Sequence, residues 1–168
     1  HMLRSMLIYL SKAEWAKNLV TNWSLAWRVA SRFIAGTTIA QAILVVRELN
    51  KAGINTTLDQ LGEHTSSVAE ANKAADGIIG TLLEIQKEGV VANVSIKLTQ
   101  IGMGMDDAAC KKNLKRILDT AKKCNNFVRI DIEDTPYTDN TIELYNAMLA
   151  LGFGPETVGM AVQSYLYR

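Results

Sequence analysis

The sequence V-R-I-D-I-E-D at Val128–Asp134 alternates aliphatic residues with charged ones. Such strict alternation predicts a β-strand with two different faces. One face is aliphatic, and the other carries a guanidinium and two carboxylates, from Arg129, Asp131 and Glu133. Charged side chains are almost never buried without partners. We therefore expect the charged face to line a polar site, with partners supplied by the rest of the chain.

Length and composition are typical of a single globular domain. With 168 residues and a formal net charge of +1, the chain lacks the basic surplus of a nucleic-acid-binding protein. No apolar run approaches the roughly 20 residues of a membrane-spanning helix, and no signal-peptide pattern is present. Cys110 and Cys124 lie too far apart on one predicted helix to bond to each other. We therefore expect reduced thiols and a cytoplasmic location. His1 and Met2 resemble a cloning remnant.

Residues 1–31 are predicted to form an N-terminal helical arm. Apolar residues recur there with helical spacing, as in one stripe of an amphipathic helix. We interpret the tryptophans of this stripe as packing anchors. A helix lying on a membrane surface through its lysines and arginine is the alternative. The stripe comprises Trp15, Leu19, Trp23 and Trp27.

Residues 32–168 repeat a pattern of short strand, turn and helix. Ser67 and Glu70 form a capping-box signature for one of the helices, and Gly89 is placed to end it. Asn140 and Glu143 are candidate caps for the last helix. Alternation of strands with helices predicts a parallel sheet covered by helices. The expected strands are Arg32–Gly36, Ile54–Leu61, Val91–Thr99, Val128–Asp134 and Thr157–Tyr165.

Two α/β architectures fit this pattern, an open doubly wound sheet and part of a (β/α)8 TIM barrel. A dinucleotide-binding sheet requires a glycine-rich turn after its first strand, but the turn at residues 35–38 has a single glycine. Polar residues instead share one parity toward the strand ends, as at the mouth of a barrel. A complete barrel has eight strands and about 250 residues. We therefore expect a partial barrel, three strands short.

Parity places three polar side chains near the C-terminal ends of consecutive strands, where barrel sites lie. These are the ammonium of Lys97, the carboxylate of Asp131 and the amide of Gln163. Duller interpretations stay open: Lys97 could simply neutralise Asp131 or Asp59, and Gln163 could be an ordinary buried amide. We interpret Arg129 as structural. His64 has no second histidine nearby, so no metal site is predicted.

Five segments in order resemble the first five strands of the flavin-dependent proline dehydrogenase family, whose fold is a (β/α)8 barrel. The similarity extends over about residues 30–168, and the preceding helices suit the N-terminal arm of that family. The segments are R-F-I-A-G at Arg32–Gly36, L-D-Q-L-G-E at Leu58–Glu63, S-I-K-L-T-Q at Ser95–Gln100, V-R-I-D-I-E-D at Val128–Asp134 and V-Q-S-Y-L-Y-R at Val162–Arg168.

The resemblance implies oxidation of L-proline to Δ1-pyrroline-5-carboxylate, with hydride passing to FAD and electrons then to a quinone. Lys97 would contact the substrate carboxylate, and Asp131 would be a catalytic-site residue. The backbone at Ile132 would touch the flavin, and Gln163 would hydrogen-bond its isoalloxazine ring. A cation that fixes the substrate and polar groups that tune the cofactor are physically reasonable. Residues expected to support these groups are Asp59, Glu63 and Glu133.

In that family the later strands and the final helix supply further flavin contacts and an arginine pair for the substrate carboxylate. The sequence stops at Arg168, so we expect a truncated fragment that is inactive by itself and does not retain FAD. Open sheet edges predict a homo-oligomer. Transfer to a quinone suggests peripheral contact with the inner membrane. A Schiff-base enzyme using Lys97 is the best alternative without a flavin.

Overall fold

A computed structural model describes residues 38–62, 64–133 and 135–164. The chain divides into two compact units, residues 1–42 and 43–168, and all of the described strands and helices belong to the second except the first residues of the helix at Ile39–Lys51. The predicted N-terminal arm and the predicted strand Arg32–Gly36 lie outside the described residues. No helix in the described ranges is long and apolar enough to cross a membrane.

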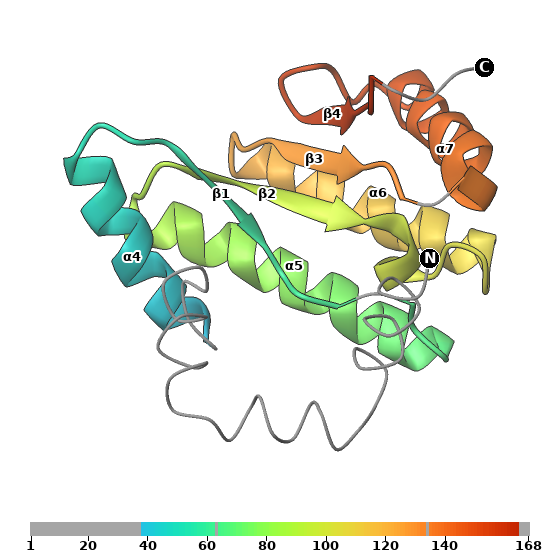
Figure 1. The fold of residues 1–168 in the computed structure, drawn as a ribbon, viewed down its shortest axis with the longest axis horizontal. Helices are drawn as coiled ribbons and strands as arrows, with labels where there is room; N and C mark the ends of the chain where they lie inside the picture. The colour runs from blue at the N-terminus through green and yellow to red at the C-terminus, as the bar shows by residue number, and fades with distance from the viewer. Residues whose placement is uncertain (1–37, 63, 134, 165–168) are drawn as a thin grey trace, which may run out of the picture. The chain divides into compact units, whose positions relative to one another are not determined.

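Four parallel strands lie side by side in sequence order, β1-β2-β3-β4, with a helix in each connection (Figure 1). This confirms the predicted strand–helix alternation. The elements are α4 (Ile39–Lys51), β1 (Thr56–Asp59), α5 (Val68–Glu88), β2 (Ala92–Lys97), the 3-10 turn η1 (Leu98–Ile101), α6 (Asp107–Lys123), β3 (Val128–Asp131), the 3-10 turn η2 (Thr135–Tyr137), α7 (Thr138–Ala150) and β4 (Val158–Ala161).

Local capping signals account for the start and the end of α5. The Ser67 hydroxyl accepts a 3.2 Å hydrogen bond from the Glu70 N–H, and the helix ends at Gly89 with φ of 62°. The return bond differs from the predicted box, because the Glu70 carboxylate accepts from Ser66 N–H and Oγ, both at 2.8 Å. The caps predicted for α7 are wrong. Asn140 and Glu143 lie inside that helix, which begins at Thr138 directly after η2.

The hydrophobic core lies between the sheet and helices α5 and α6, which run along one side of it (Figure 1). Register places Ile96 of β2 beside Ile130 of β3, and both are fully buried. Burial of an aliphatic side chain of this size contributes about 1.5–3 kcal/mol. The helices bury the matching stripes, so that the core closes over one face of the sheet. Prominent helical members are Ile78, Leu82, Ile85, Leu114, Ile117 and Leu118.

The strands are shorter than their alternating patterns predict. Lys97, Asp131 and Ala161 form the last paired row of β2, β3 and β4, and beyond this row the chain turns away. After β2 it enters η1, which the alternation did not predict. Past the end of β4 the parity rule fails, because Val162 is 70% exposed instead of facing the helices. Adjacent parallel strands with helices on one face are the arrangement of consecutive strands in a partial (β/α)8 barrel.

Candidate functional site

The face of the sheet opposite the core carries the predicted polar side chains. Lys97 of β2 and Asp131 of β3 are direct partners in the parallel register, two rows above the pair Ser95 and Arg129. The row of Lys97 and Asp131 lies at the C-terminal ends of both strands, and the row of Ser95 and Arg129 lies deeper in the sheet on the same face. The parity argument from the sequence is therefore confirmed for β2 and β3.

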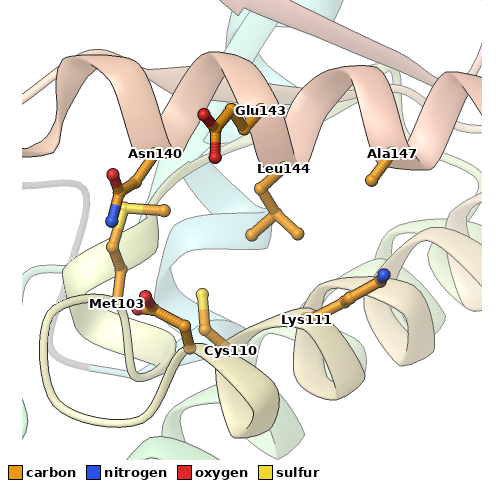
Figure 2. A pocket seen from close by; sticks show the side chains of 8 residues that line it. Met103, Cys110, Lys111, Asn140, Glu143, Leu144 and Ala147 are labelled. Carbon is orange, nitrogen blue, oxygen red and sulfur yellow. The ribbon is translucent and has the colours of Figure 1, made fainter.

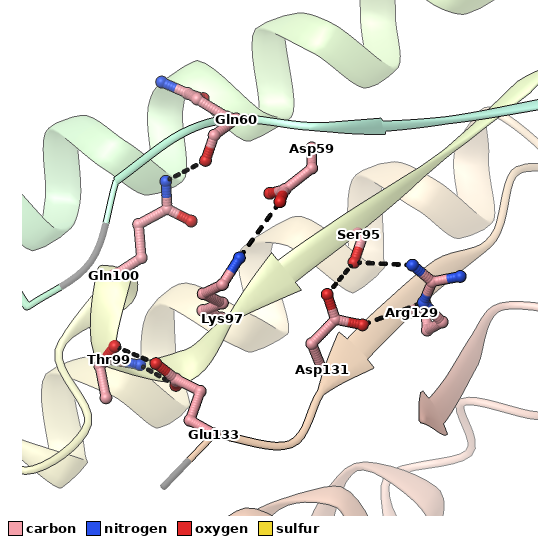
Figure 3. A network of polar contacts seen from close by, with 9 residues as sticks. All are labelled: Asp59, Gln60, Ser95, Lys97, Thr99, Gln100, Arg129, Asp131 and Glu133. Carbon is pink, nitrogen blue, oxygen red and sulfur yellow. Dashed lines mark hydrogen bonds and ion pairs between the residues drawn. The ribbon is translucent and has the colours of Figure 1, made fainter. Parts of the chain in front are cut away.

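The Asp131 carboxylate is held by two donors (Figure 3). Its Oδ2 accepts a 2.5 Å hydrogen bond from Ser95 Oγ, and its Oδ1 accepts a 3.0 Å bond from Arg129 Nε. Ser95 Oγ also accepts a 3.3 Å bond from Arg129 Nη2. The three side chains thus form a closed triangle that fixes the orientation of the carboxylate. From the sequence, Arg129 is interpreted only as a structural residue, and Ser95 is not singled out. The alternation along each strand nevertheless places both on the same face of the sheet as Asp131.

Lys97 forms its ion pair with Asp59 of β1. Nζ lies 3.1 Å from Asp59 Oδ2, and the two side chains are 22% and 37% exposed. The sequence left Asp59 and Asp131 open as partners. Because β1 and β2 pair Asp59 with Ser95, the lysine reaches back diagonally across the sheet to this carboxylate. The ion pair holds the ammonium at the C-terminal end of β2, beside the side chains of Ser95, Arg129 and Asp131 (Figure 3).

A second polar cluster ties together the chain segments that follow the strands. The Glu133 carboxylate accepts hydrogen bonds from Thr99 N–H at 3.0 Å and from Thr99 Oγ at 2.5 Å. The Thr99 carbonyl in turn accepts from the N–H and the hydroxyl of Thr65, at 3.4 and 3.3 Å. Glu133 was a predicted supporting residue. Thr99 was not singled out, although it shares the inward parity of Lys97.

The remaining predicted site residues lie at or beyond the strand ends. Ile132 is buried directly after β3, and Gln163 is exposed two residues past the end of β4. Gln163 is therefore not the buried amide that the duller interpretation of the sequence offered. Glu63 lies outside the described residues.

A separate groove of about 290 Å³ lies between α6 and α7 (Figure 2). Half-buried Leu144 and Ala147 of α7 and buried Met103 line it together with the exposed charges of Lys111 and Glu143. Its residues come from the helix layer and not from the polar face of the sheet. The groove and the strand-end cluster are therefore distinct features.

The sequence profile of the family described as proline dehydrogenase matches residues 42–168. The chain belongs to the proline dehydrogenase family. It is 38% identical over 145 residues to a proline dehydrogenase of Deinococcus radiodurans, covering 84% of this chain and 46% of that protein. It is 33% identical over 170 residues to proline dehydrogenase 1 of Bacillus subtilis, covering 99% of this chain and 54% of that protein. The chain spans about half the length of these curated proline dehydrogenases.

Solved structures share the fold of this proline dehydrogenase family member. Proline utilization A (PutA) from Bdellovibrio bacteriovorus, inactivated by N-propargylglycine, superposes with a TM-score of 0.74 and 23% identity. That match covers 84% of this chain and 17% of the other. A PutA mutant from Bradyrhizobium japonicum superposes with a TM-score of 0.58 and 22% identity, covering 77% of this chain and 15% of the other. The expected barrel-type fold is confirmed by these likenesses together with the parallel sheet.

Proposed function

We propose that these strands, within a complete (β/α)8 barrel, form part of a site that oxidises L-proline to Δ1-pyrroline-5-carboxylate. In the complete protein a bound FAD would accept the hydride, and a quinone would then accept the electrons. The observation that carries the proposal is the register pairing of Lys97 with Asp131 at the strand ends of a proline dehydrogenase family member. Functional sites of such barrels are built at this end.

The charges of the site suit an amino acid substrate. An ammonium such as that of Lys97 attracts a substrate carboxylate, and its ion pair with Asp59 limits where it can point. The Asp131 carboxylate, held by Ser95 and Arg129, lies beside it in a fixed orientation. In the reaction one C–H bond next to the ring nitrogen breaks as hydride, the nitrogen electron pair forms the C=N bond, and the proton of the ring nitrogen is released to solvent. A substrate fixed at its carboxylate presents that bond in one orientation.

The chemistry of the side chains at the strand ends fits a flavin. The exposed Gln163 amide offers both a donor and an acceptor, as the polar edge of an isoalloxazine ring requires. Of the inner face of β4, Ala161 lies next to Gln163 at the strand end and is small, whereas the space at Gly159 is filled by the Phe127 ring, whose Cζ lies 2.7 Å from the position of an added β-carbon. Gln163 and the backbone of Ile132 would hold the flavin, which supplies a two-electron acceptor.

We propose that the 168 residues alone neither turn over proline nor retain FAD, because the resemblance assigns further flavin and carboxylate contacts to later strands. We also propose that quinone reduction brings the complete protein to the inner membrane surface from the cytoplasm. The Schiff-base alternative is less well supported. It requires a free amine, whereas the Lys97 Nζ lies in an ion pair with the Asp59 carboxylate, 3.1 Å from its Oδ2. Borohydride trapping with a carbonyl substrate would detect such an enzyme.

The test joins the 168 residues to the C-terminal half of the Bacillus subtilis relative and measures proline-dependent dye reduction and flavin absorbance. We expect the fusion to bind flavin and oxidise L-proline, and the unfused chain to do neither. Lys97→Met should abolish turnover. Lys115→Met, which removes an exposed lysine paired with Asp119, should retain it. A folded, flavin-loaded fusion without proline oxidation would refute the activity, and an active Lys97→Met fusion would refute the role of the lysine.

A second proposal concerns the 168-residue chain by itself, which we expect to form a dimer or larger homo-oligomer. Leu61, just past β1, is 80% exposed and Val162, just past β4, is 70% exposed. Large apolar side chains that are exposed beside the strand ends favour association. Light scattering at micromolar concentration tests this. Replacing both residues by serine should lower the mass toward the monomer, and a monomeric parent chain would contradict the proposal.

A further inference from the structure

Thr99 forms hydrogen bonds with two segments of the chain, the one after β1 and the one after β3. It lies in η1, directly after β2, and is 1% exposed. Its N–H and hydroxyl both donate to the Glu133 carboxylate, and its carbonyl accepts from Thr65. One residue therefore links the segments that follow β1, β2 and β3. Each of these segments starts at the end of the sheet where the polar side chains lie (Figure 3).

The contact between Thr99 and Glu133 continues the pairing of β2 and β3 past the last backbone row. That row is Lys97 with Asp131, and Thr99 and Glu133 each lie two residues further on. Beyond this last backbone row, the Glu133 carboxylate accepts hydrogen bonds from the backbone N–H and the hydroxyl of Thr99. Two donors on the two oxygens of one carboxylate fix its orientation, and hydrogen bonds to an ionised carboxylate are the strong ones.

We propose that Thr99 and Glu133 form a positioning pair that fixes the Asp131–Ile132 backbone. The strand ladder holds this dipeptide on one side, and the Glu133 carboxylate anchors it on the other. The Asp131 side chain is oriented separately, by Ser95 and Arg129. The pair therefore controls where the main chain at Ile132 lies, whereas the triangle controls the carboxylate.

The consequence for catalysis rests on the proposed function, in which the Ile132 backbone faces the flavin. A main chain that moves there changes the distance between cofactor and substrate without removing any group that touches either. Displacements of about 1 Å at a reacting centre lower rates strongly, by up to about a hundredfold. Loss of the pair should therefore lower kcat more than it changes the KM for proline.

Hydrogen exchange on the 168-residue chain tests the positioning role without any need for activity. Glu133→Gln and Thr99→Val should raise amide exchange at Ile132 and Glu133 about tenfold, the factor expected for loss of a charge-assisted hydrogen bond. Thr99→Ser keeps the hydroxyl, so amide exchange at Ile132 and Glu133 should stay as slow as in the parent chain. The matched control is Thr120→Val on α6, whose hydroxyl donates to the Arg116 carbonyl of its own helix. It should leave exchange at Ile132 unchanged.

A purely stabilising role predicts a different result. Exchange would then rise together throughout β2 and α6, in step with a lower unfolding midpoint, and this outcome would overturn the proposal. Unchanged exchange at Ile132 in both Thr99→Val and Glu133→Gln would overturn it as well. If the completed fusion fails to oxidise proline while the local exchange effect appears, the proposed function is refuted and the positioning pair stands.

Discussion

Ser95 Oγ lies 2.5 Å from Asp131 Oδ2, and this short hydrogen bond joins β2 to the charged face of β3. Ser95 is 2% exposed and also accepts from Arg129. Its hydroxyl therefore bridges the half-exposed guanidinium and the carboxylate, which also contact each other directly at 3.0 Å. The buried serine thus helps to fix the orientation of both charged side chains.

Removal of this hydroxyl should destabilise the chain. In Ser95→Ala the Asp131 carboxylate loses a buried donor, and we expect the free energy of unfolding to fall by about 1–3 kcal/mol. Urea unfolding followed by circular dichroism measures the change. Ser164→Ala, which alters an exposed serine past β4, should shift the midpoint little. Equal midpoints for the two variants would contradict the role of Ser95.

A β-carbon at Gly104 should also be destabilising. Its φ is +79°, and an added Cβ would lie 2.5 Å from Tyr137 Cε1. We expect Gly104→Ala to lower stability by about 1–3 kcal/mol through backbone strain and displacement of the tyrosine. Gly80→Ala is the matched control, since Gly80 lies inside α5 with open space at its Cβ position. It should stabilise the chain by about 0.5–1 kcal/mol. Thermal unfolding showing the same sign for both would refute this.

The cap of α5 should respond to acid. Hydrogen bonds from the backbone and hydroxyl of Ser66 lower the pKa of Glu70 below its usual value. Because the folded-state pKa is lower than the unfolded one, the interaction stabilises fully above the unfolded-state pKa. It is lost as pH falls through the folded-state pKa. Carbon-13 titration of the Glu70 carboxyl checks the direction. Ser66→Ala keeps the N–H and should move the pKa only part of the way back. A parent titration at or above the ordinary glutamate pKa would contradict the interaction.

The two cysteines should differ in reactivity. Burial, reinforced by the charge of Asp107, raises the pKa of Cys110 to about 12, so its reactive thiolate is scarce at neutral pH. Burial also raises the pKa of Cys124, but this side chain is partly exposed. We expect a disulfide reagent at about pH 8 to label Cys124 alone in the native chain. Cys124→Ser should then show no labelling until denaturant is added. Rapid native labelling of that variant would contradict the burial of Cys110.

Much of the fold is local in origin and was therefore predictable from the sequence. Side chains alternate along any extended strand, so the pattern at Val128–Asp134 determined which side chains share the polar face. Hydrogen bonds between near neighbours determine a helix start, so Ser67 and Glu70 marked the beginning of α5. The order of five motifs along the chain also indicated the family, because a family resemblance depends on residue identity and order and not on packing.

Only the tertiary structure determined which charged side chains form ion pairs with each other. Lys97 pairs with Asp59 and not with its register partner Asp131, because Ser95 and Arg129 already hold that carboxylate. The bonds of Thr99 to Glu133 were likewise hidden, since they depend on how two strands end relative to each other. Parity depends on the backbone of one strand alone. Partner choice depends on the register between strands and on competition among donors, and both arise only when distant segments pack together.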